Sequence, residues 1–543
     1  MRITNKIMRN NSLYNLNQNK LLEDKLTNQM TNQSKIARPS DDPVVAIRAL
    51  RLRSNVTHVT QYHEKNAADA DHWLTVTADA LTTIDEILKN LYENVESAAN
   101  KDMTSDNLRI LLTQMKSLTK EFYASGNVDY AGRYIFSGYR TDTAITFSAE
   151  DIKEMVKHPV SYKIKQNLSF SDIDSFDYTD FTYLSQNIGG DGVNPADGTS
   201  YEQQIKNGQI FRLRLAYDNL DAKDPELDPS DPNYDPANPP KSKLIFTDAM
   251  GKDLTLKRNP DGTPVNPPES VVTEYASAEE AYQKIISGEE TGIAYVPSTG
   301  ELLFGKDYYE TNFREGNNFQ VTYEKSDWRE DDINPVHYFE CTETKDVGAG
   351  KPPKVTNYNT GATTQPQDIY YDVGFNQKIQ VNTLASEVFT HGVQRDMDDF
   401  QRCLQQLQGI ETQISDIKKK RDEYSEDSNE YKNLTKKLEA AEKAQSYIRE
   451  SIHTRFENQI TKYQDYMNNN NIAITNNATR GSRLDLISTR LENQQATFKD
   501  LQTDNESIDV TQVAVELSSS ELTYQAALMA TGKIMQTNLM NYI

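Results

Sequence analysis

Apolar residues recur at helical spacing near both ends of the chain. Over residues 508–543 they fall three, four or seven positions apart, which places them on one stripe of an α-helix. Over residues 1–30 they fall mostly seven apart, with a second set that steps by four on an adjoining face. Each end therefore predicts a helix with an apolar stripe that needs a partner.

We predict that the two terminal helices pair and that their stripes also join neighbouring copies of the chain. Charge favours pairing weakly, because residues 1–40 carry seven Lys or Arg against two acidic residues (+5), whereas 508–543 carry one Lys against three acidic residues (−2). Such helices are only partly formed in isolation, so we expect loose ends in the free protein that become ordered on assembly. A plainer alternative is an in-chain helix pair that closes a monomer. The predicted polymerisation interface consists of Ile3, Ile7, Tyr14, Leu21, Leu26, Val513, Leu517, Tyr524, Leu528, Met535 and Tyr542.

A long helix is predicted to follow the N-terminal one. Asp42 is placed to cap it and Pro43 suits its first position. Apolar residues then continue at helical spacing from Val45 to Val95 without a Pro or Gly, and a second helix is predicted to end at Gly126.

Short strands are predicted further along. Residues 132–138 and 144–147 read as two strands of a hairpin with a polar turn between them. Four more strands are predicted at Ile210–Leu215, Ser242–Thr247, Gly292–Val296 and Phe319–Tyr323.

The proline distribution marks an inserted domain. Sixteen of the nineteen prolines lie between residues 181 and 375, and none lies in 376–543. Within this part, 221–240 is predicted to be a long acidic loop, and 259–262 a turn.

After residue 382 the pattern is helical again. Leu404–Ile417 forms one apolar stripe, and 434–467 forms a second that is predicted to run antiparallel to it. Asp427 and Glu430 offer a capping box for the second helix. A third stripe over 484–501 leads into the terminal segment.

Together these patterns predict a multidomain α+β protein with a discontinuous helical core and an inserted β-rich domain. The predicted parts are the terminal coiled-coil polymerisation segments 1–38 and 508–543, a helical bundle of long helices with a β-hairpin over 39–184 and 376–507, with a helical hairpin at about 404–467, and a β-rich outer domain over 185–375.

Composition narrows the function. A net charge of −23 argues against general nucleic-acid binding, which requires basic patches, and no apolar run approaches the length of a membrane span. The N-terminus has no apolar segment of the kind found in a cleaved signal peptide, so we expect the chain to be cytoplasmic or exported without one.

Sites of enzymatic chemistry are not indicated by the sequence. The seven histidines show no metal-ligand spacing, and the two cysteines, Cys341 and Cys403, form neither a disulfide framework nor a CxxC site. Gly348–Lys351 resembles the end of a phosphate loop, but its first glycine is missing and Pro352 replaces the Ser or Thr. We therefore predict no catalytic residue, no metal and no cofactor.

Three motifs, in order, carry a family resemblance. They are Arg38-Pro-Ser-Asp-Asp-Pro43, Gly132-Arg-Tyr-Ile-Phe-Ser-Gly-Tyr-Arg-Thr-Asp-Thr143 and Asn538-Leu-Met-Asn-Tyr-Ile543. In these motifs the chain resembles the flagellar hook-associated protein 3 family, flagellin-like proteins of the hook–filament junction. The resemblance covers residues 1–150 and 475–543. The proline-rich middle and the 404–467 hairpin match none of the motifs.

The resemblance implies a structural, non-enzymatic subunit of the bacterial flagellum. It implies terminal helices that form an inner coiled-coil tube, export through the flagellar type III apparatus to an extracellular position, and a chaperone that protects the C-terminal helix. The implied partners are hook-associated protein 1, flagellin and other copies of the chain in a ring, with no nucleic acid and no membrane. Two alternatives stay open at this point: a flagellin of the filament itself, or a surface adhesin or enzyme whose activity lies in the inserted domain.

Overall fold

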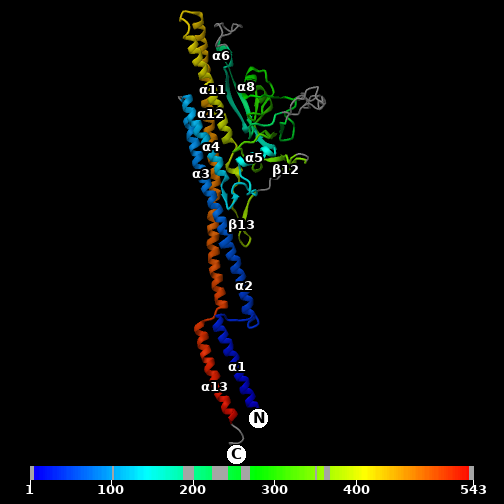
Figure 1. Ribbon diagram of the computed structural model, residues 1–543, viewed down its shortest axis with the longest axis vertical. Helices are drawn as coiled ribbons and strands as arrows, with labels where there is room; N and C mark the ends of the chain where they lie inside the picture. Colours follow the sequence, from blue (N-terminus) through cyan, green and yellow to red (C-terminus); the bar gives the residue numbers. More distant parts are fainter. Residues whose placement is uncertain are drawn as a thin grey trace, which may run out of the picture. The chain divides into compact units, whose positions relative to one another are not determined.

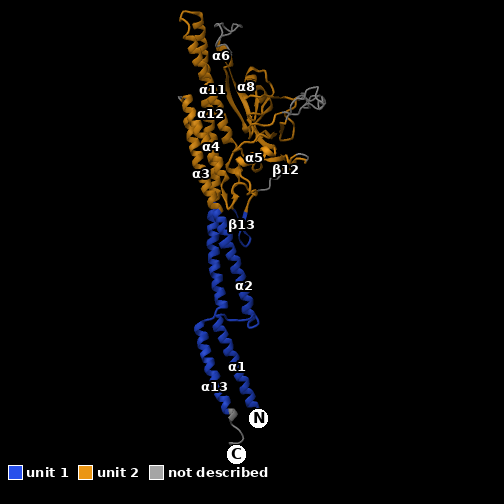
Figure 2. Ribbon diagram, viewed as in Figure 1, with its two compact units in different colours: residues 1–72, 370–380, 479–543 blue, residues 73–369, 381–478 orange. Residues whose placement is uncertain are grey.

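The computed structural model describes residues 5–100, 103–186, 201–222, 243–257, 270–348, 351–359 and 367–536. Within it the chain divides into two compact units (Figure 2). Unit 1 comprises residues 1–72, 370–380 and 479–543, and unit 2 comprises 73–369 and 381–478. Most of the predicted acidic loop and all of the predicted turn at 259–262 lie outside the described residues.

Unit 1 consists of helices and one hairpin (Figure 1). Its elements are α1 (Asn5–Asn32), α2 (Pro43–Thr60), the π-helix η1 (Gln61–Ala67), the start of α3 (Ala68–Ala98), strands β13 (Tyr370–Gly374) and β14 (Gln377–Gln380), the last part of α12 (Asn429–Glu506), and α13 (Val510–Gln536). The hairpin packs on η1, where the side-chain amide of Asn66 donates to the carbonyl of Asp372 over 2.7 Å.

The predicted long helix is confirmed as three consecutive helical elements, α2, η1 and α3. The Asp42 carboxylate accepts hydrogen bonds from the amides of Val44 (2.9 Å) and Val45 (3.1 Å), and Pro43 is the first helical residue, as predicted. The π-helical turn of η1 was not predicted, because it interrupts neither the apolar periodicity nor the run without Pro or Gly.

Long helices also form one part of unit 2. These are α3, α4 (Ser105–Ala124), α11 (Gly392–Arg421) and the first part of α12. The side-chain amides of Asn470 and Asn477, both buried in α12, donate to the α3 carbonyls of Leu81 (3.1 Å) and Leu74 (2.9 Å). Because donors and acceptors are each seven residues apart, the two bonds set the register of the antiparallel helices.

The two stripes predicted at 434–467 and 484–501 lie on one helix of 78 residues, α12. The asparagine-rich segment between them stays helical because its buried members bond to α3. The cap is Ser428, whose hydroxyl accepts from the amide of Tyr431 over 3.1 Å, one residue after the predicted Asp427.

Two five-stranded sheets form the rest of unit 2. Their orders are β12-β11-β3-β10-β6 and β4-β5-β9-β8-β7, antiparallel except for the parallel pair β7 and β8. The strands are β3 (Val160–Ser169), β4 (Ile173–Asp180), β5 (Lys206–Arg214), β6 (Ile245–Asp248), β7 (Val272–Glu274), β8 (Ile293–Val296), β9 (Glu301–Phe304), β10 (Asn318–Lys325), β11 (Glu340–Lys345) and β12 (Lys354–Tyr358). The short helices are α5 (Ala149–Lys157), α6 (Thr182–Gln186), α7 (Tyr201–Gln204), α8 (Ala278–Ser287), α9 (Lys306–Asn312) and α10 (Ala385–Val388).

All four strands predicted in this part of the sequence are present, as β5, β6, β8 and β10. Strands β3 and β4 lie before residue 185. The proposed start of an inserted domain at residue 185 stays a prediction.

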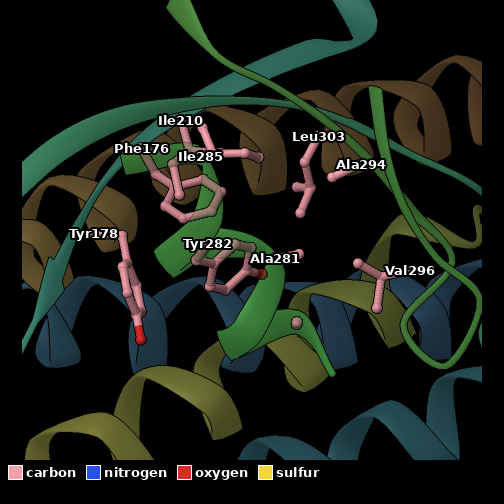
Figure 3. Packing of buried hydrophobic residues seen from close by; sticks show 10 residues of the cluster. Phe176, Tyr178, Ile210, Ala281, Tyr282, Ile285, Ala294, Val296 and Leu303 are labelled. Carbon is pink, nitrogen blue, oxygen red and sulfur yellow. The ribbon is translucent and has the colours of Figure 1, made fainter. Parts of the chain in front are cut away.

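Helix α8 covers one face of the second sheet and forms a core with it (Figure 3). Glu279 and Glu280 lie in its first turn, and Gly288 ends it in the left-handed conformation at φ +76°. Its buried side chains pack against strands β4, β5, β8 and β9. The cluster contains Phe176, Tyr178, Ile210, Ala278, Ala281, Tyr282, Ile285, Ala294, Val296 and Leu303.

A buried ion network joins the second sheet to α11. From β5, Arg212 donates to Glu301 over 2.9 Å and to Asp399 over 2.8 Å, and Arg214 donates to Asp396 over 2.6 Å. Burial alone would raise the pKa of Asp399, but the neighbouring guanidinium groups hold it well below its usual range. Each of these charged groups therefore has an oppositely charged partner, which offsets part of the cost of its burial.

The predicted hairpin of 132–138 with 144–147 is wrong in its pairing. The hairpin is formed by β1 (Asp129–Tyr130) and β2 (Arg133–Tyr134), whereas Thr146 makes an isolated bridge with Ile333. Ala131 (φ +52°) and Gly132 (φ +75°) form a two-residue turn with both φ angles positive, the type that suits a tight hairpin.

Candidate assembly surface

The two terminal helices, α1 and α13, lie side by side in unit 1 (Figure 1). They run antiparallel, because the C-terminal end of α1 meets the N-terminal end of α13. Their buried and half-buried positions alternate by four and three residues, as in a coiled coil. These in-chain seam positions are Ser12, Leu16, Asn19, Glu23, Leu26 and Met30 on α1, and Val513, Leu517, Ser520, Tyr524, Ala527 and Thr531 on α13.

This in-chain seam is only partly apolar. Leu26 and Val513 are 5% and 8% exposed, but half of the α1 positions are polar. Since coiled coils owe most of their stability to apolar residues at these positions, the seam gives the pair limited hydrophobic stabilisation.

Each terminal helix carries a second apolar stripe that its in-chain partner leaves exposed. The exposed stripes are Ile7, Tyr14 and Leu21 on α1, and Val515, Leu522 and Met529 on α13. Tyr14 is 64% exposed and Leu522 is 70% exposed. At about 100° per residue, each exposed stripe lies roughly opposite the in-chain seam of its helix. The pair therefore presents one apolar face on the α1 side and another on the α13 side.

The eleven residues predicted for the polymerisation interface fall into three groups. Ile7, Tyr14, Leu21 and Leu528 are exposed. Leu26, Val513, Leu517 and Tyr524 lie instead in the in-chain seam. Ile3 and Tyr542 lie outside the described residues, and only the backbone of Met535 is described.

The exposed stripe of α13 was missed by the sequence analysis. Val515, Leu522 and Met529 repeat at seven residues, as do Ile7, Tyr14 and Leu21. This seven-residue spacing could have revealed the exposed stripe of α13. It was overlooked because the residues of the in-chain seam form a second apolar stripe on the same helix.

A short antiparallel joint connects the terminal pair to α2 and α12. Ser34 bridges to Ser507, and the amide of Lys35 donates to the carbonyl of Glu506 over 2.8 Å. The Arg53 guanidinium donates to the Glu506 carboxylate over 2.8 Å, and this hydrogen bond lowers the pKa of Glu506. The joint therefore depends on paired backbone groups and on one ion pair.

The first two recognised motifs have clear structural roles. In Arg38–Pro43 the Asp41 carboxylate accepts from the amides of Ala37 (3.1 Å) and Arg38 (2.8 Å), which folds the turn before α2. In the second motif, the Arg133 guanidinium lies 4.8 Å from the ring centre of Trp73, which is buried in α3.

A cavity of about 300 Å³ lies beside α4 and α11 in unit 2. Two of its carboxylates are paired: Asp331 with Lys120 at 3.1 Å, and Asp398 with Arg395 at 3.3 Å. Elsewhere, burial raises the pKa of the Cys341 thiol to about 12. Among the described residues, no three His, Cys, Asp or Glu are grouped as metal ligands, and no helix there is long and apolar enough to cross a bilayer.

Comparison with known proteins points to the flagellum. Residues 3–141 match the family described as the bacterial flagellin N-terminal helical region. This match includes α1, α2, α3 and α4, together with the first motif and all but the last two residues of the second. It confirms the flagellin-like resemblance of the N-terminal quarter of the chain.

Two curated relatives carry the same name. The chain is 30% identical over 123 residues to flagellar hook-associated protein 3 of Escherichia coli, and 26% identical over 145 residues to that of Salmonella typhimurium. These matches cover 22% and 26% of this chain and 38% and 45% of the relatives, so the chain spans less than half of either relative's length. They confirm the predicted resemblance to hook-associated protein 3.

Solved structures of flagellar junction proteins were also matched, at low similarity. The junction protein FlgL from Legionella pneumophila is 9% identical with a TM-score of 0.25, and 80% of this chain and 99% of that chain are covered. FlgL of Xanthomonas campestris is 10% identical, also at 0.25, with 82% and 98% covered. At TM-scores this low, the likeness supports no inference about this chain.

Proposed function

We propose that this chain is a structural, non-enzymatic subunit of the bacterial flagellum that joins the hook to the flagellin filament. The observation that carries the proposal is the pair of exposed stripes on α1 and α13, in a chain whose N-terminal quarter matches flagellin and hook-associated protein 3. A helix pair with apolar faces on opposite sides is suited to contact two neighbours.

The two helices that carry these faces also differ in net charge. Helix α1 carries four Lys or Arg and two acidic residues, a balance of +2, and α13 carries one Lys and two Glu, a balance of −1. We therefore expect α1 of one copy to pack against α13 of the next. This contact joins different surfaces, so it builds a ring when the rotation closes and a helical array when it does not.

The proposed neighbours are other copies of this chain, hook-associated protein 1 on one side and flagellin on the other. We further propose export without a cleaved signal peptide, with a chaperone covering the C-terminal helix before assembly. The name of the relatives, flagellar hook-associated protein 3, supports a place at the hook. The exposed α13 stripe supports a need for protection before assembly.

A flagellin of the long filament is the second candidate, because the family match is to a flagellin region. Deletion of the gene distinguishes the two candidates. A junction subunit should leave hooks without filaments and unpolymerised flagellin in the medium. Hooks without secreted flagellin would identify the chain as the filament protein instead.

The same deletion strain tests the exposed stripes. Tyr14→Ser and Leu522→Ser should each fail to restore filaments while the protein is still exported. Val156→Ser is the matched control, because Val156 is at least as exposed but lies on α5 in unit 2. Full restoration by both stripe variants would refute the proposal.

A further inference from the structure

Unit 1 has a second pair of outward faces beyond the terminal helices. On α2, Val44, Ile47 and Leu50 are exposed, and Val44 is 77% exposed. At about 100° per residue they lie opposite the face of α2 that holds buried Ala49 and Val59. They form an apolar patch with no cover among the described residues.

The helix surface around this apolar patch is basic. Helix α2 contains Arg48, Arg51 and Arg53 and no acidic residue. Arg53 is paired with Glu506 at the joint, whereas Arg48 and Arg51 are exposed and take part in no ion pair of the described residues. Two guanidinium groups therefore lie beside the apolar patch, ready for an acidic partner.

The outward face at the end of α12 has complementary chemistry. Leu501 is exposed there, together with the carboxylates of Asp500 and Asp504. The side-chain amide of Asn505 donates to the carbonyl of Val45 over 3.2 Å, which places the start of α2 level with the end of α12. Two arginines and two aspartates therefore lie at the same level on the two sides of unit 1.

We infer that the α2 patch of one copy docks on the outward face of α12 in a second copy of this chain. The inference deepens the proposed function and rests on it, because the step that brings α1 onto α13 of a neighbour also brings α2 beside α12 of that neighbour. The occupant is a second copy because the outward face of α12 supplies an exposed leucine and two carboxylates at the level of Arg48 and Arg51. This second contact makes assembly sensitive to salt, unlike the apolar stripes.

Cysteine trapping tests the geometry in the purified full-length chain. Ile47→Cys with Leu501→Cys should give a ladder of disulfide-linked copies under mild oxidation, and neither single variant should give one beyond a dimer. The natural thiols, Cys341 and Cys403, are both buried and leave a low background. Leu21→Cys with Leu522→Cys reports separately on the terminal stripes.

The outcomes separate this inference from the proposed function. Ladders from both cysteine pairs support the α2–α12 contact and the proposed function. A ladder from the terminal pair alone overturns the α2–α12 contact and leaves the proposed function intact. No ladder from either pair, at concentrations up to the solubility limit, overturns copy-to-copy assembly as well.

Charge reversal identifies the partner. Arg48→Glu with Arg51→Glu, or Asp500→Lys with Asp504→Lys, should lower the yield of the Ile47–Leu501 ladder roughly tenfold, since two ion pairs at ~0.7 kcal/mol each make about tenfold. Combining all four reversals in one chain should restore it, because the pairs re-form with opposite sign. Failure to restore, with normal folding by circular dichroism, would overturn the proposed pairing of α2 with α12.

Discussion

Leu522→Ala gives the most direct measure of the exposed stripe on α13. The side chain is 70% exposed in the single chain, so its truncation removes little from the fold. Full burial of a leucine contributes about 1.5–3 kcal/mol, and the part still exposed here accounts for about 1–2 kcal/mol per contact between copies. Since 1.4 kcal/mol corresponds to about a factor of ten, the critical concentration for assembly should rise about 5- to 30-fold.

Sedimentation of assembled against free protein over a concentration series gives this critical concentration. Val156→Ala serves as the control of similar exposure outside unit 1, and should leave it unchanged. Leu26 is 5% exposed and lies in the in-chain seam. Leu26→Ala should raise the critical concentration at least as far as Leu522→Ala does, since truncation of a buried leucine lowers stability by about 2–5 kcal/mol. A Leu522→Ala value within twofold of the unaltered protein, or an equal shift in Val156→Ala, would refute the reasoning.

Three further predictions concern the free chain. Amide exchange on dilute protein should be much faster in α1 and α13 than in α3, because the in-chain seam is weak; equal protection would favour the alternative of a closed monomer. Asn477→Ala should lower the free energy of unfolding of unit 2 by about 1–3 kcal/mol in a urea titration, because the α3 carbonyl of Leu74 loses its extra donor, whereas exposed Asn471→Ala should change it little. Burial lowers the pKa of His391 to about 3. The unfolded chain therefore binds a proton at this residue below about pH 6.5, whereas the folded chain binds it only below about pH 3. The free energy of unfolding should therefore decrease as the pH is lowered from about 6.5 to 3, by about 2–3 kcal/mol at pH 4.5. His391→Phe should remove this part of the acid sensitivity. An unchanged pH profile of stability in the variant would contradict a lowered pKa of His391.

Long-range periodicity made most of the helical core predictable. The cap at Asp42, the helix through Val95 and the end of the next helix near Gly126 follow from local residue chemistry, and the structure contains them. Four strands of the β-rich part were found in the same way, since each is a short apolar run between turn residues.

What was missed depends on tertiary contacts. The asparagines at 470 and 477 suggest a break in a helix, and only their bonds to α3 explain why α12 continues through them. The tight turn at Ala131 and Gly132 lacks the usual Asn-Gly signal, so the hairpin was paired with the wrong segment.

The interface was half predictable for a related reason. A stripe of apolar residues shows that a helix has a partner, but it does not show which partner takes which stripe. Leu26 and Val513 are used within the chain, while Tyr14 and Leu21 remain exposed, and that division appears only once α1 and α13 are placed together. The buried ion network around Asp399 was likewise invisible, because its members are far apart in sequence.

The unequal faces of unit 1 bear on how an array of this chain would end. In an open array, the first copy leaves one kind of face uncovered and the last copy leaves the other. One end then exposes Tyr14 on a helix of net charge +2, and the other exposes Leu522 on a helix of net charge −1. Two chemically different proteins are needed to cover the two ends of such an array. The direction of the array therefore follows from the difference between the two faces of one copy.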